Sequence, residues 1–538
     1  MEFDYVILGG GSAGSVLAGR LSEDPDVSVC LIEAGGAGKD LLIRMPLGCV
    51  VLLPDFPKIN NWCFETVPQP GLNGRKGYQP RGKALGGSSA INAMLYVRGH
   101  RRDYDEWADL GCEGWDWESV LPYFRKAERN HTLNGALHGT DGPLHVGDGL
   151  SNNPANEAFI KAAEAMQIRP TADFNGDRQE GVGPFQVTQF RGGDKHGERC
   201  SAAAAYVHPV MDRPNLTVLT KAHISKVLIE DGRAIGARYL IKGKEHEVRA
   251  RREVILSAGA FGSPQLLLLS GIGPEEELRA HGIEPVHVSP GVGQNLQDHL
   301  DFILSWKTPR PELLGLNPSG IYDMIKAALH WRKTGEGRAT TTFAEIGAFL
   351  RSTPGLDRPD LQIHFVTGIV DDHSRKRHFY KGYSAHICVL RPESRGEVGL
   401  FDANPRSAPR IDPKFLSEQA DADLLLAGSK ILREMMQGPA MADWRGEQLY
   451  LKGDEDDATL MRHIRDRADT IYHPVGTCRM GTDETAVVDP KCRVRGIEGL
   501  RVVDASIMPR LVGGNTNAPT IMIAEKVADM ICAERRQP

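Results

Sequence analysis

The sequence lacks the features that mark extracellular, membrane-spanning and metal-dependent proteins. Its nine cysteines are scattered and form no Cys-x-x-Cys pair, which argues against a disulfide framework and against a zinc or iron–sulfur site. No uninterrupted apolar stretch approaches the ~18 residues that a membrane-spanning helix needs. The first predicted strand begins within a few residues of Met1, so we expect no signal peptide and a cytoplasmic location.

Charge and composition exclude further classes of function. The 64 Lys and Arg against 70 Asp and Glu give a formal net charge of −6. No basic block or basic–aromatic alternation is present, so we expect no nucleic-acid partner. Hydrophobic residues make up 41% and charged residues 25% of the chain, as is typical of globular proteins. At 538 residues the chain is long enough for more than one domain.

The N-terminal stretch carries a dinucleotide-binding pattern. An apolar run at residues 5–8 predicts a buried strand, and Gly9, Gly11 and Gly14 follow at the G-x-G-x-x-G spacing. These glycines allow a tight turn, a close approach of the backbone to a pyrophosphate, and close packing of helix on strand. A second apolar run ends at Glu33, where a carboxylate is expected to accept hydrogen bonds from a ribose.

The rest of the chain divides into two regions. Runs at residues 216–219, 224–229 and 253–260 predict strands that return the chain to the nucleotide domain. Between about 300 and 470, residues 321–329 predict an amphipathic helix, and 343–350 and 385–390 predict strands. We therefore expect an α/β (α+β) protein of two domains. A Rossmann-like nucleotide domain comprises residues 1–150, 215–300 and 470–538, and a discontinuous substrate domain with an antiparallel sheet and helices comprises 151–214 and 301–469.

Several further segments resemble the glucose–methanol–choline (GMC) family of flavoenzymes. Residues 82–92 (GKALGGSSAIN) resemble its first signature, and residues 259–273 (GAFGSPQLLLLSGIG) its second. Residues 472–477 (YHPVGT), 504–506 and 514–520 are similar to its C-terminal catalytic and flavin-holding segments. Within the family, residues 92–100 (NAMLYVRGH) are most similar to bacterial FAD-dependent alcohol and choline dehydrogenases that pass electrons to a quinone.

The resemblance implies FAD as the cofactor. Members with covalent flavin carry a His before the Asn of the first signature, whereas this chain has Ile91, so we expect non-covalent FAD. Ile224 lies where the family places a contact to adenine, and the last helix is expected to begin near Thr520 with its positive end by the flavin. The full set of predicted cofactor-binding residues is Gly9, Gly11, Ser12, Ala13, Gly14, Glu33, Ala34, Arg81, Gly82, Leu85, Gly86, Gly87, Ser88, Asn92, Ala93, Met94, Ile224, Ala258, Gly259, Asp504, Ala505, Asn515, Thr516, Asn517 and Thr520.

Oxidation of an alcohol needs a base for the hydroxyl proton and an acceptor for the hydride. A base with a pKa near working pH points to histidine, and His473 matches the catalytic His of the family. Asn517 falls where the family has a second His or an Asn, so we expect it to hold the alkoxide oxygen. Asp298 and His299 are interpreted as structural, and Cys478 as a small buried residue.

The expected function is FAD-dependent oxidation of a primary alcohol to an aldehyde, with electrons passed to a quinone-type acceptor. A dioxygen-using alcohol oxidase, a choline dehydrogenase and a non-redox hydroxynitrile-lyase-type member stay open as alternatives. The expected partners are a small-molecule alcohol and a quinone or other acceptor, with a peripheral contact at the inner membrane as an open alternative. The candidate for that contact is the helix near residue 325, although packing on the substrate domain is favoured; its residues are Ile321, Met324, Ile325, Ala328 and Leu329, beside Lys326, Arg332 and Lys333.

Overall fold

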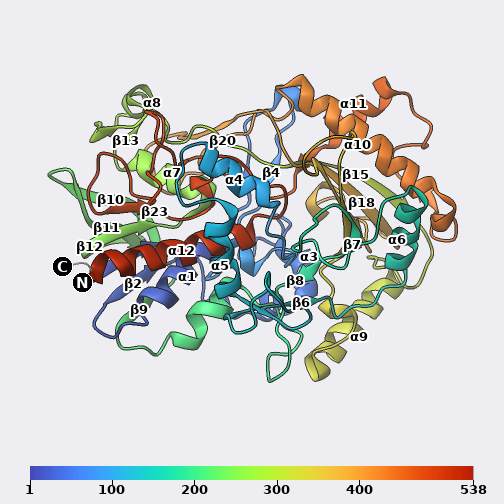
Figure 1. Cartoon of the computed structure of the whole chain (residues 1–538), viewed down its shortest axis with the longest axis horizontal. Helices are drawn as coiled ribbons and strands as arrows, with labels where there is room; N and C mark the ends of the chain where they lie inside the picture. Colours follow the sequence, from blue (N-terminus) through green and yellow to red (C-terminus); the bar gives the residue numbers. More distant parts are fainter. Residues whose placement is uncertain (537–538) are drawn as a thin grey trace.

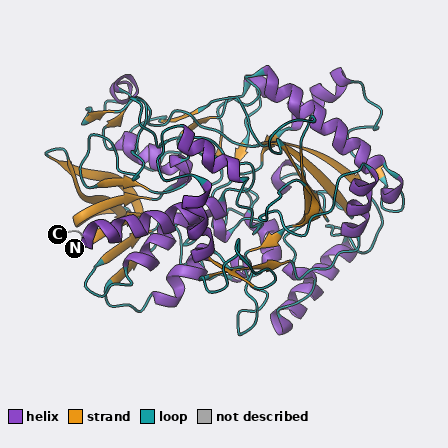
Figure 2. Cartoon of the chain, in the orientation of Figure 1, coloured by secondary structure: helices purple, strands orange, loops and turns teal. Residues whose placement is uncertain are grey.

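Two seven-stranded sheets organise the protein, one in each half of the molecule (Figure 1; Figure 2). The structure is a computed structural model that describes residues 1–536. The first sheet has the order β10-β11-β12-β1-β2-β9, with β23 beside β12. Its strands are β1 (Glu2–Leu8), β2 (Val29–Ile32), β9 (Leu216–Leu219), β10 (His223–Glu230), β11 (Arg233–Ile241), β12 (Lys244–Leu256) and β23 (Leu500–Val502).

The centre of this first sheet is parallel. β1 pairs in parallel with β2 and β12, and β2 pairs in parallel with β9. Residues 5–8 are all buried, which explains their continuous apolar run, because a central parallel strand is covered on both faces. Helix α12 (Asn517–Arg536) packs against α1 (Ser12–Leu21) and α5 (Trp117–Ala127) at this sheet. The half of the molecule built on this sheet is called the nucleotide lobe below.

The second sheet is antiparallel and has the order β21-β15-β18-β17-β16-β7, with β22 beside β15. Helices α6 (Ala155–Ala165), α10 (Gln419–Gln437) and α11 (Asp457–Arg467) lie around it (Figure 1). This half is called the substrate lobe. Its strands are β7 (Gly181–Pro184), β15 (Leu300–Lys307), β16 (Ala344–Leu350), β17 (Leu361–Val366), β18 (Gly382–Val389), β21 (Glu447–Gln448) and β22 (Asp469–Thr470).

The two faces of the second sheet differ in polarity. Phe302, Ile363 and Ile387 belong to the apolar core that also contains residues of α6 and α10. Because side chains alternate along a strand, the residues between them point to the other face. That face carries His364 and His386, which stand opposite each other on β17 and β18. The polar face is turned toward the main cavity of the protein, since both histidines line it.

Several short elements complete residues 1–536. Helix α4 (Arg101–Asp109) follows the second glycine loop, and α7 (Gly259–Leu269) follows β12. No helix in this range is long and apolar enough to cross a membrane. The other helices are α2 (Leu41–Arg44), α3 (Cys49–Leu52), α8 (Glu275–Ala280) and α9 (Pro318–Thr334). The other strands are β3 (Phe64–Glu65), β4 (Tyr78–Gln79), β5 (Glu128–Asn130), β6 (Leu144–Asp148), β8 (Gln186–Val187), β13 (Ile272–Gly273), β14 (His287–Val288), β19 (Glu397–Gly399) and β20 (Arg410–Asp412).

The predicted fold class is confirmed, with local differences. The strand expected to reach residue 260 ends at Leu256, because Gly259, with φ +80°, turns the chain into α7. The last helix begins at Asn517, three residues earlier than expected. The three-stranded sheet β5-β6-β8 spans the expected boundary at residue 150, while β7 joins the second sheet, as a discontinuous substrate domain requires. The domain boundaries themselves stay a prediction.

Candidate active site

Two glycine loops form a cradle in which backbone touches backbone. Gly9 has φ +110°, and a Cβ there would lie 2.5 Å from the carbonyl oxygen of Ser257. A Cβ on Gly87 would lie 2.7 Å from Cα of Gly11, so the second loop packs directly on the first. The amide of Gly86 donates to the carbonyl of Gly10 at 2.7 Å. Side chains are excluded here, and the N-terminus of α1 is left facing a large cavity, as phosphate binding requires.

This cavity has a volume of about 930 Å³, near the upper end of the ~300–1,000 Å³ usual for ligand pockets. It extends from the glycine cradle to the polar face of the second sheet. All but three of the predicted cofactor-binding residues line it. The three exceptions are Gly14, Leu85 and Gly86, which lie behind its wall. A Cβ on Gly14 would lie 1.9 Å from the carbonyl oxygen of Gly9, so Gly14 serves packing, and Leu85 is fully buried in the core.

Two buried carboxyl groups frame the cavity on the nucleotide lobe. The oxygens of Glu33 accept hydrogen bonds from the amides of Gly10 (3.0 Å) and Gly35 (2.6 Å), and burial raises the pKa of Glu33 to about 7. Asp504 accepts from the amide of Gly259 and the hydroxyl of Ser263, and burial raises its pKa as well. Neither forms a salt bridge within residues 1–536, so backbone and hydroxyl donors orient both groups. The ribose contact of Glu33 stays a prediction.

His473 meets a second histidine at the junction of the two lobes. Its Nδ1 lies 2.9 Å from Nδ1 of His299, and Nε2 of His299 lies 3.1 Å from the carbonyl oxygen of Leu390. A carbonyl only accepts, so Nε2 of His299 carries its proton and Nδ1 of His299 is the acceptor. His473 therefore carries its proton on Nδ1, and its Nε2 keeps a free lone pair.

Asn515 marks where that lone pair points. Its side-chain Nδ2 donates to Nε2 of His473 at 3.1 Å, while its Oδ1 accepts from Gln362 of β17 at 3.2 Å. Both Asn515 and His473 line the cavity. A neutral imidazole acceptor and a carboxamide donor thus converge on one place in the cavity.

The surroundings keep His473 unprotonated. Burial, with His299, His364 and Arg81 nearby, holds its pKa well below the usual 6.5. Burial likewise lowers the pKa of His299 to about 3. The main chain is held too, because the amide of His473 donates to Asp298 at 2.9 Å. The arrangement can accept a proton from a hydroxyl without first losing one.

The structure places the two asparagines before and at the start of α12 in different contacts. Oδ1 of Asn517 accepts from the hydroxyl of Ser12 at 2.7 Å and joins α12 to α1; Asn517 also lines the cavity, and its role at the alkoxide oxygen stays a prediction. Asn515, which precedes α12, is the asparagine that contacts His473. His299 and Asp298, interpreted as structural, both touch His473. The sequence signal for this contact was the Asp298–His299 pair directly before β15.

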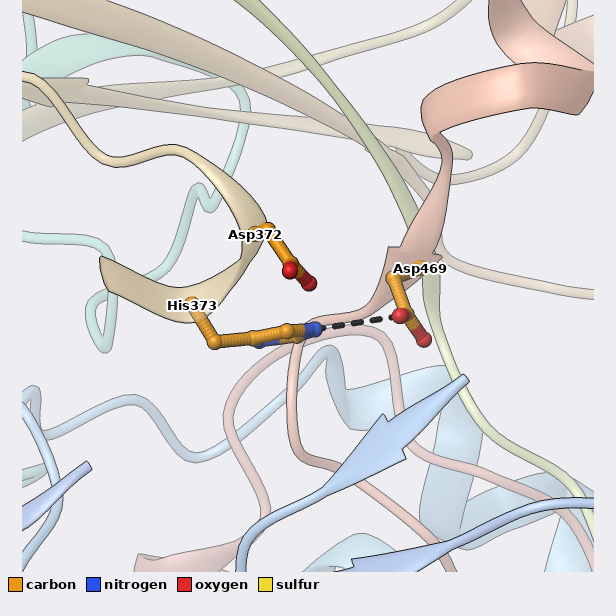
Figure 3. A group of neighbouring side chains, drawn as sticks. All are labelled: Asp372, His373 and Asp469. Atoms are coloured by element: carbon orange, nitrogen blue, oxygen red, sulfur yellow. Dashed lines mark ion pairs between the residues drawn. The ribbon is translucent and has the colours of Figure 1, made fainter. Parts of the chain in front are cut away.

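A polar group on the substrate lobe, made of Asp372, His373 and Asp469 (Figure 3), contacts Tyr472 beside the base. Nδ1 of His373 lies 2.8 Å from the Tyr472 hydroxyl, and its Nε2 lies 3.2 Å from Asp469. The carboxylate of Asp372 lies close enough to both to suggest a cation site. Asp372 already pairs with Arg375 at 2.6 Å, so a guanidinium supplies the positive charge, and we assign the group to support of Tyr472.

Comparison with known proteins agrees with this geometry. Sequence profiles of the GMC oxidoreductase family match residues 3–301 and 392–524. An alcohol dehydrogenase [acceptor] of Pseudomonas putida is 48% identical, covering 98% of this chain and 95% of that protein. An oxygen-dependent choline dehydrogenase of Pseudomonas fluorescens (strain SBW25) is 43% identical, covering 100% and 94%. A formate oxidase structure from Aspergillus oryzae RIB40, concerned with FAD modification, has a TM-score of 0.90 at 28% identity and covers 99% of both chains.

These matches confirm the resemblance inferred from the glycine loops and the Tyr-His-Pro segment. The profiles cover well over half of the chain, and relatives more than 40% identical align along nearly its whole length. The protein is therefore an oxidoreductase and belongs to the GMC oxidoreductase family.

Proposed function

We propose that the protein oxidises a primary alcohol to an aldehyde with FAD and passes the electrons to a quinone-type acceptor. The observation that carries this proposal is the neutral His473, whose Nε2 lone pair meets the Asn515 amide at the cavity wall. The glycine cradle supports a dinucleotide, since it admits backbone but no side chain at Gly9 and Gly87. The P. putida relative is named as an alcohol dehydrogenase [acceptor].

The residues of this chain have separate tasks in that reaction. Bound FAD supplies the hydride acceptor. Nε2 of His473 takes the hydroxyl proton, and the Nδ2–H of Asn515 donates to the oxygen on which negative charge develops. The N-terminus of α12, with Asn517 and Thr520 at the cavity wall, directs its positive end into the cavity.

The residue at position 91 supports non-covalent, dissociable FAD. Ile91 lines the cavity with an apolar side chain and offers no nucleophile. Precipitation with acid should therefore release the yellow cofactor into the supernatant. Flavin that stays in the washed pellet would contradict this, and mass spectrometry of peptides would then find the linkage.

The base is tested by His473→Ala. Loss of general-base help typically lowers a rate by ~10²–10⁴-fold, so anaerobic bleaching of the flavin by an alcohol should slow by that factor while FAD content stays normal. Cys478→Ala is the matched control, because Cys478 is buried nearby and has no assigned role. Bleaching within a few-fold of wild type would place the base elsewhere, and a wild-type protein that alcohols never bleach would favour the lyase alternative.

The proposed membrane contact, and with it access to a membrane-dissolved quinone, depends on helix α9. The expectation favoured packing of this helix on the substrate domain, but among its residues only Gly320 and Trp331 are buried. Ile321, Ile325 and Leu329 are 43%, 57% and 65% exposed along one face. The basic residues Lys326, Arg332 and Lys333 are also exposed. An apolar face with basic edges is the pattern of a helix that lies on an anionic lipid surface.

The position of α9 connects this face to the cavity. Ile321 both lines the cavity and is exposed, as are Phe56 and Phe379, so these residues mark its mouth. α9 lies at the outer edge of the substrate lobe (Figure 1). Contact through α9 would bring the mouth to the membrane, where quinones are dissolved.

Sedimentation with phosphatidylglycerol vesicles tests this contact. The double variant Ile325→Glu/Leu329→Glu should lose binding, while Phe401→Glu, which alters a 56% exposed residue that does not line the cavity, should keep it. Equal binding of all three proteins would contradict the α9 contact. Alcohol-dependent reduction of a soluble quinone should also exceed oxygen uptake under matched conditions. Oxygen uptake at least as fast would instead favour an oxidase, as the name of the P. fluorescens relative suggests.

A further inference from the structure

The wall of the cavity opposite the glycine cradle carries a second acid–histidine pair. Nδ1 of His386 on β18 lies 2.7 Å from Oδ2 of Asp301 on β15. Both residues are buried, with 7% and 4% of their surface exposed. This pair is separate from the group around His473 and from the residues predicted to bind the cofactor.

The other nitrogen of His386 has no partner. Its Nε2 is buried without a hydrogen bond among residues 1–536, and His386 lines the cavity. A buried polar atom left unpaired is unfavourable and rare. Because this atom belongs to a cavity-lining residue, a group inside the cavity is the natural partner.

The strand register relates this pair to the reacting centre. Asp301, the partner of His386, follows His299, the partner of His473, by two residues. The side chains of Asp301 and His299 therefore leave the same side of one chain segment, at positions about 7 Å apart. On β17, Gln362 contacts Asn515, and His364, two residues later, stands opposite His386. His386 is therefore displaced along the sheet from the place where His473 and Asn515 converge.

We propose that Asp301 and His386 bind a second hydroxyl of the substrate, so that diols are preferred over plain alkanols. This inference rests on the proposed alcohol oxidation. A hydroxyl fits because it donates to or accepts from Nε2, wherever the proton of the acid–histidine pair resides. A quaternary ammonium makes no such hydrogen bond. His386 engages Asp301 through Oδ2, while Oδ1 of Asp301 is buried without a partner among residues 1–536. Asp301 is a positioning residue that fixes the imidazole, and His386 makes the contact.

The rest of the wall suits a carbon chain between two hydroxyls. Apolar side chains also line the cavity near the second sheet, among them Leu95, Phe343, Val366 and Ile369. An alkyl chain along this surface gains from burial, but a plain alkanol leaves Nε2 of His386 unpaired. A diol of matching length fulfils both requirements.

A matched substrate series tests the site in the holoenzyme. Anaerobic flavin reduction is followed with 1-alkanols and the corresponding α,ω-diols, from propyl to octyl. The wild type should favour one or more diols by about 10- to 100-fold in kcat/KM, beyond the twofold expected from two equivalent hydroxyls. His386→Leu should lose this preference and still oxidise plain alkanols within about threefold of wild type. His386→Gln, which keeps a polar atom near the Nε2 position, should retain part of the preference, and Asp301→Asn should weaken it.

The outcomes separate this inference from the proposed function. If alkanols never reduce the wild-type flavin, alcohol oxidation itself fails. If alkanols react and no diol is favoured at any length, the second hydroxyl site is wrong. Equal loss of alkanol and diol oxidation in His386→Leu would show that His386 only supports the fold, and would also overturn the inference.

Discussion

Replacing His299 by leucine tests whether the histidine pair sets the tautomer of the base. In the structure, Nδ1 of His299 is the acceptor for the Nδ1–H of His473. Leucine removes that acceptor and leaves the Nδ1–H buried without a partner, which costs about 1–3 kcal/mol. The proton is then better placed on Nε2, and that tautomer has no lone pair facing the cavity.

The size of the effect depends on Asn515. For Nε2–H to find an acceptor, the carboxamide of Asn515 must turn over, and it then loses the hydrogen bond from Gln362. That loss costs about 0.5–1.5 kcal/mol and offsets part of the gain. The two ranges leave a net change of about 1 kcal/mol at their midpoints, and of at most about 2.5 kcal/mol, in favour of the inactive tautomer. The rate should therefore be about 5-fold lower, and at most about 70-fold lower. The effect should be no larger than that of His473→Ala.

The assay is anaerobic stopped-flow bleaching of the flavin by a saturating alcohol. His299→Asn is the control, because its Oδ1 can accept the Nδ1–H of His473 although it also loses the Leu390 contact. It should stay within about twofold of wild type, and FAD content and Tm should be similar in both variants. If His299→Leu, fully loaded with FAD, bleaches within threefold of wild type, the tautomer assignment is refuted.

Three further predictions concern the cofactor cradle and the loop before α12. Asn515→Ala should slow flavin reduction by about 10²-fold, whereas Asn517→Ala should weaken FAD retention with a smaller effect on the rate of the loaded enzyme, because Asn517 joins α12 to Ser12. Equal kinetics of the two loaded variants would contradict this assignment of roles. Gly87→Ala places a Cβ 2.7 Å from Cα of Gly11 and should lower FAD affinity at least tenfold, as measured by fluorescence titration of the apoprotein. Burial raises the pKa of Glu33 from 4.5 to about 7, so between these pH values the folded apoprotein keeps a proton that the unfolded chain has lost. The free energy of unfolding should therefore fall as the pH rises from 4.5 to about 7. Glu33→Gln should reduce this pH dependence, as measured by denaturant titrations.

Features carried by short spacing were predictable from the sequence. The strand, glycines and acid from residue 5 to Glu33 lie within one supersecondary unit, so their order alone indicates the cradle. Most of the predicted cofactor-binding residues accordingly line the cavity. Gly14, Leu85 and Gly86 do not, because sequence spacing cannot separate a residue that faces the ligand from one that packs directly behind it.

Features that depend on long-range packing were not predictable in this way. His299 and His473 are 174 positions apart, and they meet because β15 pairs with β22, with Leu300 opposite Thr470. The polar face of the second sheet depends in turn on the register that sets His364 opposite His386. The contact of Asn515 with His473 has a similar origin, since the residue at which α12 begins decides which asparagine remains in the loop.

The division of labour between the lobes follows from where the base is anchored. Backbone and carboxyl groups of the nucleotide lobe form the cradle, whereas the tautomer and orientation of His473 depend on His299 and Gln362, which lie at the second sheet. Burial favours this design, because a neutral histidine pair meets a smaller desolvation penalty than an acid–histidine pair carrying charge. Substitutions on the polar face of the second sheet should therefore alter the rate of alcohol oxidation and the choice of substrate without altering FAD affinity. The converse should hold for substitutions in the glycine loops.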